Sequence, residues 1–235
     1  MKKYLATILG ALLIGALLAA CGGGGGGGSS SGGSTGPVTS PNAFPLASGW
    51  QSLVASGQTV RFNSSGTCNG TFSNISAPAN VSTTFEGQPA LSGVSVISYS
   101  FTNCTPSSAV STETRYYDTN YIPKGISIQG GNYGVYASTP TIPATVHVGD
   151  AGVIGTINLY TTSAKTTSAG RIDASYVIEP DTATTAIVNV IDKVYNTSGV
   201  LTSTEQDRYR MQANGALTAI SYDILYSSGT HLILQ

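Results

Sequence analysis

The two histidines are the first candidates for catalysis, because a nucleophilic serine or cysteine needs a neighbouring base. His147 lies in a strand-like run beside a glycine-containing turn at 149–152, and His231 lies in the last strand-like run. Neither is near a recognisable serine or cysteine motif. Residues 32–36 match the G-x-S-x-G nucleophile elbow, but the elbow needs a strand before it and a helix after it, which a polyglycine stretch excludes. We predict no catalytic residue.

Glu205 and Asp207 are the candidates for paired-carboxylate chemistry. They lie two residues apart on one expected strand, so their side chains share a face. A glycoside hydrolase needs two carboxyl groups at about 5 Å or about 6.5–9.5 Å. The pair therefore keeps an envelope glycan hydrolase open as an alternative function.

A structural interpretation of these charges is favoured. Arg208 alternates with the two acids and lies on the other face of the expected strand. If Asn214-Gly215 forms a two-residue turn, Gln206 pairs with Asp223, and Arg208 lies diagonal to Asp223. This register predicts a cross-strand ion pair.

Tyrosine outnumbers phenylalanine 13 to 5, and a group of exposed tyrosines would form a binding surface. Five tyrosines cluster in one irregular, glycine-containing stretch: Tyr116, Tyr117, Tyr121, Tyr133 and Tyr136. Exposed loop tyrosines can stack on sugars or anchor a protein partner. Tyrosine is also a good strand residue, so a core-and-strand role stays open. We take the cluster as the candidate binding surface and the more regular C-terminal strands as scaffold.

The N-terminus has the order of a secretory signal. Lys2 and Lys3 precede an apolar run at 4–18, which is too short for a confident membrane span. Residues 18–21, Leu-Ala-Ala-Cys, resemble the lipobox of bacterial lipoproteins. The resemblance implies removal of residues 1–20 and acylation of Cys21. An ordinary signal peptide with a chance cysteine is the alternative.

The lipoprotein resemblance also implies a location. Two or more acyl chains hold a protein stably on a membrane. In this family an aspartate after the cysteine retains the protein in the inner membrane, and here that position is Gly22. We therefore expect a lipid-anchored protein of the cell envelope, at the outer membrane of a Gram-negative bacterium.

With Cys21 acylated, Cys68 and Cys104 remain as a pair. The compartment beyond the inner membrane is oxidising, and an even pair there indicates a disulfide. Metal ligation is the competing interpretation. It lacks ligands, because neither histidine is at metal-site spacing from a cysteine. We predict a Cys68–Cys104 disulfide, no metal and no cofactor.

Composition divides the chain into four parts. Residues 21–44 are rich in glycine and serine and predict a flexible tether after the signal peptide, 1–20. An N-terminal β part at 45–145 and a C-terminal part at 146–235 follow, which we expect to form one continuous domain. Charged residues make up only 9%, and removal of the two signal-peptide lysines leaves eight basic and eleven acidic groups, a net charge of −3. This mild charge excludes a nucleic-acid binder.

The C-terminal part has the clearest strand pattern. Apolar and polar residues alternate, and turn residues separate six expected strands at 153–162, 171–179, 184–195, 200–211, 216–226 and 230–234. This order predicts an antiparallel meander. A three-residue last turn with Gly229 in the left-handed conformation would pair Ile224 with Leu232 and Tyr222 with Leu234, which keeps one apolar face continuous.

The N-terminal part is less regular. Its expected strands are 58–63, 67–74, 81–86, 93–102, 113–117 and 126–137, with prolines in the connections. Only residues 48–56 could form a short helix. The predicted class is all-β, with antiparallel sheets: a sandwich-like N-terminal half with one disulfide, and the six-stranded meander.

Several segments of the domain resemble a group of Gly/Ser-tethered lipoproteins of β-proteobacteria: 66–70, 84–87, 101–106, 116–118 and 205–210. The resemblance covers nearly the whole mature domain, and it defines no catalytic or binding residues. The long tether would let the domain search the space near the membrane, so we expect a non-enzymatic binding or structural protein of the envelope. Its partner would be an envelope protein, a glycan or a lipid. A carrier of an apolar ligand in a half-open sheet is a second alternative.

Overall fold

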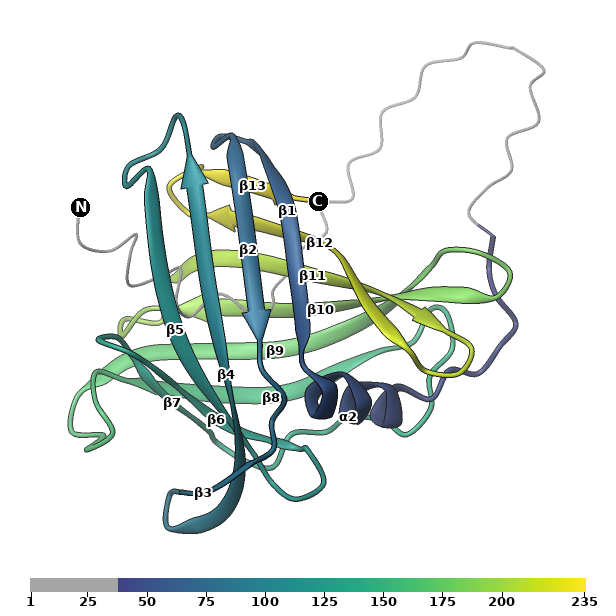
Figure 1. Ribbon diagram of the computed structural model, residues 1–235, viewed down its shortest axis with the longest axis horizontal. Helices are drawn as coiled ribbons and strands as arrows, with labels where there is room; N and C mark the ends of the chain where they lie inside the picture. Colours follow the sequence, from purple (N-terminus) through teal and green to yellow (C-terminus); the bar gives the residue numbers. More distant parts are fainter. Residues whose placement is uncertain (1–37) are drawn as a thin grey trace.

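Residues 38–235 form a β-barrel in the computed structural model, which describes this part of the chain (Figure 1). Thirteen strands make one antiparallel sheet, and the pairing of β2 with β4 closes twelve of them into a ring, with β3 attached to β4. The strands are β1 (Gln58–Gly66), β2 (Gly70–Ser76), β3 (Val81–Phe85), β4 (Gln88–Phe101), β5 (Ser108–Tyr117), β6 (Pro123–Ile128), β7 (Tyr133–Tyr136), β8 (Ala151–Tyr160), β9 (Ser168–Pro180), β10 (Thr185–Tyr195), β11 (Leu201–Gln212), β12 (Leu217–Tyr226) and β13 (His231–Leu234).

The all-β class is confirmed, but the sandwich and the separate meander are wrong. The six C-terminal strands are neighbours in sequence order, as expected, yet they form one arc of a closed wall. Figure 1 shows β1, β2, β4 and β5 crossing β8 to β11 on the opposite side at a steep angle. Closure required pairings between distant segments, β1 with β13 and β2 with β4, which strand periodicity does not specify.

The predicted turn between β12 and β13 is confirmed at the level of single residues. Ile224 pairs with Leu232 and Tyr222 with Leu234, and Gly229 has a φ of 87°. Gln206 pairs with Asp223 as expected, but the two-residue Asn214-Gly215 turn is wrong. Met211 pairs with Leu217 across a longer loop, and a register shift between Arg208 and Tyr209 restores the expected pairing. Correct register here follows from the alternation of one apolar face, because a slip by one residue would turn that face to water.

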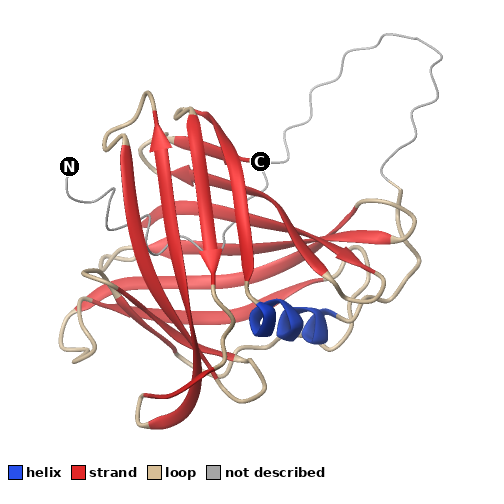
Figure 2. Ribbon diagram, viewed as in Figure 1, coloured by secondary structure: helices blue, strands red, loops and turns tan. Residues whose placement is uncertain are grey.

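One helix, α2 (Leu46–Ser56), lies at the barrel end where β1 begins (Figure 2). It confirms the short helix expected at 48–56. A Cβ atom on Gly49 would lie 2.1 Å from the carbonyl oxygen of Gly215, so the helix packs directly on the β11–β12 turn. We call this end of the barrel the α2 end.

The packed part of the chain begins before residue 45. Val38 bridges Asp181, and Phe44 bridges Val146 and is fully buried. Residues 38–44, assigned to the tether from their composition, therefore lie on the barrel. The rest of the tether, the signal peptide and Cys21 lie outside the described residues.

The predicted disulfide is present at the other end of the barrel. Cys68 lies in the β1–β2 turn and Cys104 in the β4–β5 turn, with their Cα atoms 5.5 Å apart. Within residues 38–235, no helix has the length and apolar character needed to cross a membrane.

The inward face of the wall carries the hydrophobic core. Tyr222 has no exposed surface, and the rings of Phe62 and Phe72 pack against it edge-on, with centroids 5.2 and 5.8 Å away. The outward face holds ion pairs such as Arg208 with Glu179 and exposed aliphatic side chains such as Val110 and Val153. Charged side chains also point into the barrel interior.

Candidate functional site

Glu205 and Asp207 point into the barrel rather than toward surface partners. Their strand, β11, alternates buried and partly exposed residues, and the two acids share the buried face with Tyr209 and Met211. Glu205 is 1% exposed and Asp207 is 2% exposed. The shared face was predicted correctly, but it is the inner face.

The expected ion pair between Arg208 and Asp223 is wrong, although the register behind it is right. Arg208 reaches across β10 to Glu179 on β9, with 3.1 Å between Arg208 Nε and Glu179 Oε2. Asp223 is instead 2.8 Å from His231 Nε2. The long arginine side chain thus spans two strands on the outer face, and neither Glu205 nor Asp207 takes part.

Three further charged side chains belong to the same interior region. Asp192 on β10 lies directly opposite Glu205 and is fully buried. Glu113 on β5 is buried and forms an ion pair with Arg115, whose side chain is 18% exposed. Four carboxyl groups therefore lie inside the barrel with one guanidinium, and we call these five residues the interior charge cluster.

The protein surrounds several of these carboxyl oxygens without donating hydrogen bonds to them. Both oxygens of Asp192, both of Glu205 and Oδ1 of Asp207 are buried and have no N–H or O–H donor. Leaving a buried carboxylate without donors or counter-charge is costly, so such groups bind a proton or a cation.

Burial shifts the protonation of these acids accordingly. It raises the pKa of Asp207 to about 7, with the Arg115 charge opposing the shift. Burial and the neighbouring Asp207 charge hold the pKa of Asp192 well above its ordinary value. Burial, followed by the charges of Asp207 and Asp192, does the same for the pKa of Glu205. At neutral pH the cluster therefore keeps protons that exposed carboxyl groups would lose.

Glu205 and Asp207 are neighbours on the inner face of β11, and the Asp207 charge adds to the effect of burial in raising the pKa of Glu205. Within the described part of the chain, no group of three or more His, Cys, Asp or Glu side chains is placed to hold a metal ion.

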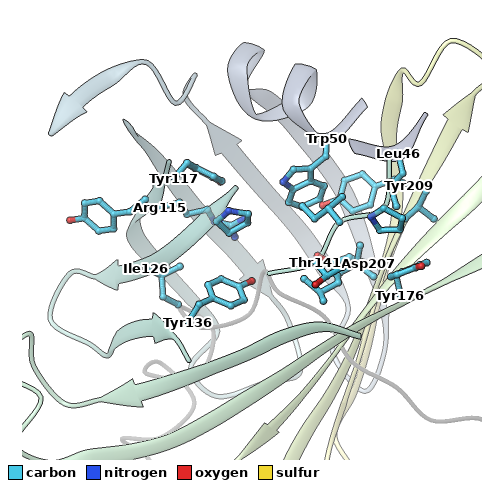
Figure 3. A pocket seen from close by; sticks show the side chains of 18 residues that line it. Leu46, Trp50, Arg115, Tyr117, Ile126, Tyr136, Thr141, Tyr176, Asp207 and Tyr209 are labelled. Carbon is cyan, nitrogen blue, oxygen red and sulfur yellow. The ribbon is translucent and has the colours of Figure 1, made fainter. Parts of the chain in front are cut away.

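A pocket with a volume of about 60 Å³ lies between α2, the loop at 141–143 and the inner wall, and it reaches Asp207. Its lining is mostly aromatic and aliphatic, and Arg115 and Asp207 are its charged members. In Figure 3, Trp50, Tyr209, Asp207 and Tyr176 gather on one side of the pocket, and Arg115, Tyr117, Ile126 and Tyr136 on the other. This volume admits a few water molecules or the end of a slender chain.

Trp50 gives this pocket a built-in reporter. It is the single tryptophan of the chain, and it extends from α2 into the pocket wall (Figure 3). Its indole Nε1 is buried and has no hydrogen-bond acceptor. The pocket therefore offers an unused donor at Trp50 and an unused acceptor at Asp207.

The five tyrosines proposed as a binding surface are not on one surface. Tyr116, Tyr117 and Tyr136 line the interior pocket. Tyr116 stacks on Phe85, with ring centroids 4.4 Å apart, and Tyr133 packs against the same ring. Tyr121 occupies a turn with a φ of 60°. The expectation that they form a surface separate from the scaffold is therefore wrong, because four of the five line the pocket or pack on Phe85.

The histidines lie where the sequence placed them, away from the pocket. His147 Nδ1 is 3.8 Å from Asp150 in an exposed turn, and His231 contacts Asp223 on the outer face. Neither belongs to the interior charge cluster.

Sequence reasoning missed Asp192, Glu113 and Arg115. A signal for Asp192 was present, because it falls at the same alternating positions as Val188 and Val190 and so shares their buried face. The strand expected at 113–117 contains Glu113 and Arg115. It is short, and its sequence pattern does not show which of its two faces points into the barrel. Only closure of the barrel brings β5 opposite β10 and β11.

Comparisons of this chain with protein-family models, curated proteins and solved structures find no match to any of them.

Proposed function

We propose that this protein is a non-enzymatic, lipid-anchored protein of the cell envelope whose barrel binds a small, slender and mainly apolar ligand at the α2 end. The anchor part of the proposal rests on the lipobox-like sequence ending at Cys21, which also favours the outer membrane. The binding part rests on the pocket beside Trp50.

A single observation carries the binding function: an aromatic and aliphatic pocket at a barrel end contains two convergent charged side chains, Arg115 and Asp207. Mostly apolar pockets with a few placed polar groups are typical ligand sites, and the mouths of β-barrels are a common place for them. A half-open sheet was expected for a carrier, but the sheet is closed. A ligand would therefore enter past α2 and the loop at 141–143.

Energy transfer from Trp50 to N-phenyl-1-naphthylamine, a neutral apolar probe, tests this function on the purified protein. We expect saturable, one-to-one quenching of Trp50 emission, because the tryptophan forms part of the pocket wall. The variant Thr141→Phe places a larger side chain at the rim, where Thr141 is exposed, and should abolish the quenching.

Thr145→Phe is the matched control. Thr145 is an exposed threonine of the same loop and does not line the pocket, so this variant should bind the probe as the unmodified chain does. Equal probe binding by both variants, or no quenching in the unmodified chain, would rule out the pocket as the binding site.

A further inference from the structure

Acids outnumber bases around the pocket floor. Of the four carboxyl groups in the interior charge cluster, Glu113 forms an ion pair with Arg115. Asp192, Glu205 and Asp207 are all at least nine-tenths buried. Asp207 loses its proton as the pH rises past about 7, and the carboxylate that this leaves repels an anionic ligand.

Asp207 is the member of this acidic group that reaches the pocket. It lines the cavity and is 2% exposed, and its Oδ1 atom has no donor from the protein. Asp192 and Glu205 do not line the cavity and lie beyond Asp207. A ligand that enters from the α2 end therefore meets Asp207 before the other two.

The walls beside Asp207 are aromatic. Trp50, Tyr176 and Tyr209 lie on the same side of the pocket as Asp207 (Figure 3). The faces of aromatic rings attract a cation within about 6 Å, most strongly where water is excluded. A carboxylate among aromatic rings is a suitable environment for an organic cation, whereas the acids are not placed to coordinate a metal ion.

We infer that the pocket recognises a slender alkyl ammonium group, with its N–H groups donating to Asp207 and its carbon chain lying along Trp50 and Tyr176. This inference rests on the binding function proposed above and names its ligand class. An ammonium group brings a positive charge to the ionised Asp207 carboxylate, together with three donors. An alcohol supplies one donor and no charge, and a carboxylate ligand supplies none.

Binding of a cation to Asp207 should depend on pH. The charged and titratable groups around Asp207 are Glu205 on its own strand, Asp192 on β10, Glu113 and Arg115 on β5, and the hydroxyls of Tyr209 and Tyr222. An alkylamine stays protonated between pH 5.5 and 8, as lysine does. Its affinity should therefore increase as Asp207 loses its proton, by up to about tenfold per pH unit below the pKa of Asp207.

Titration of Trp50 fluorescence with n-hexylamine, n-hexanol and hexanoate tests the inference. We expect hexylamine to bind at least about tenfold more tightly at pH 8 than at pH 5.5, and more tightly than hexanol at pH 8. Hexanol should show little pH dependence, and hexanoate should bind least. Dihexanoyl phosphatidylethanolamine, added as a fourth ligand, distinguishes a lipid headgroup from a free amine as the source of the ammonium.

The variant Asp207→Asn should lower hexylamine affinity at pH 8 by at least about tenfold and leave hexanol affinity within about twofold, because the shape of the side chain is kept. Asp223→Asn is the matched control, since it removes the same charge from the outer face of the neighbouring strand. Hexanol binding in Asp207→Asn also reports that this variant is folded.

The outcomes separate the two proposals. If hexanol binds and hexylamine binds no more tightly, or if Asp207→Asn leaves hexylamine affinity unchanged, the ammonium inference is overturned while the pocket stands. If neither these ligands nor the neutral probe binds, the binding function itself fails.

Discussion

Raising the pH from 5 to 7 should destabilise the barrel, because burial raises the pKa of Asp192, Glu205 and Asp207 and these acids fold with their protons. Burial raises the pKa of Asp207 to about 7, whereas an exposed aspartate has a pKa of 3.8. Between these values the folded chain keeps a proton that the unfolded chain has released. An acid whose pKa is raised by folding contributes most to stability at low pH, and that contribution is lost as the pH rises toward its folded pKa.

The magnitude follows from the size of the shift. One such group changes the free energy of unfolding by about 1.4 kcal/mol per pH unit, so Asp207 alone should remove about 2 kcal/mol between pH 5 and pH 7. For a domain of this size, that loss lowers the melting temperature by roughly 4–8 °C. The raised pKa values of Asp192 and Glu205 act in the same direction.

Thermal unfolding followed by circular dichroism at pH 5, 6 and 7 measures this slope. Asp207→Asn removes one titrating group and should flatten the slope. Asp181→Asn should leave the slope unchanged, because the ion pair with Arg210 lowers the pKa of Asp181 and keeps it ionised from pH 5 to 7. A melting temperature that stays constant or rises from pH 5 to pH 7 would refute the burial of protonated acids in the barrel.

Three other changes have defined outcomes. Tyr222→Ala should lower the free energy of unfolding by about 3–5 kcal/mol, because the side chain is fully buried among aromatic rings. An unchanged midpoint in chemical denaturation would contradict the place of Tyr222 in the core. The double variant Cys68→Ser, Cys104→Ser should lower the free energy of unfolding by roughly 4 kcal/mol, since the disulfide closes a loop with a sequence separation of 36. Equal stability of the reduced and oxidised chains would contradict this prediction. Cys21→Ser should leave an unprocessed precursor that takes up no acyl label, and normal labelling would exclude Cys21 as the anchor.

Local features of the barrel were predictable because they depend on neighbouring residues. Alternation and turn residues specified the strands from β8 to β13 and the exact pairing of Ile224 with Leu232. Closure was not predictable in this way. It depends on the pairing of β1 with β13 and of β2 with β4, which alternation within a single strand leaves undetermined.

The candidate site was only partly predictable for the same reason. The sequence showed that Glu205 and Asp207 share a face, but Arg208, which follows them on the other face, suggested a surface ion pair. Their burial becomes clear only when β5 supplies Arg115 from the opposite wall and α2 supplies Trp50 from the barrel end. The tyrosine-rich stretch was misleading because composition does not show which partners each side chain packs against: Tyr117 is buried at the pocket, whereas Tyr116 stacks on Phe85.

The indole N–H resonance of Trp50 tests the central claim most directly, because a chain with one tryptophan gives one such signal in a ¹H–¹⁵N spectrum. Titration with n-hexylamine at pH 8 should shift this resonance to saturation, and Thr141→Phe should abolish the shift. A resonance that stays in place while the ligand binds elsewhere, or no binding at all, would contradict a ligand site at the α2 end of the barrel.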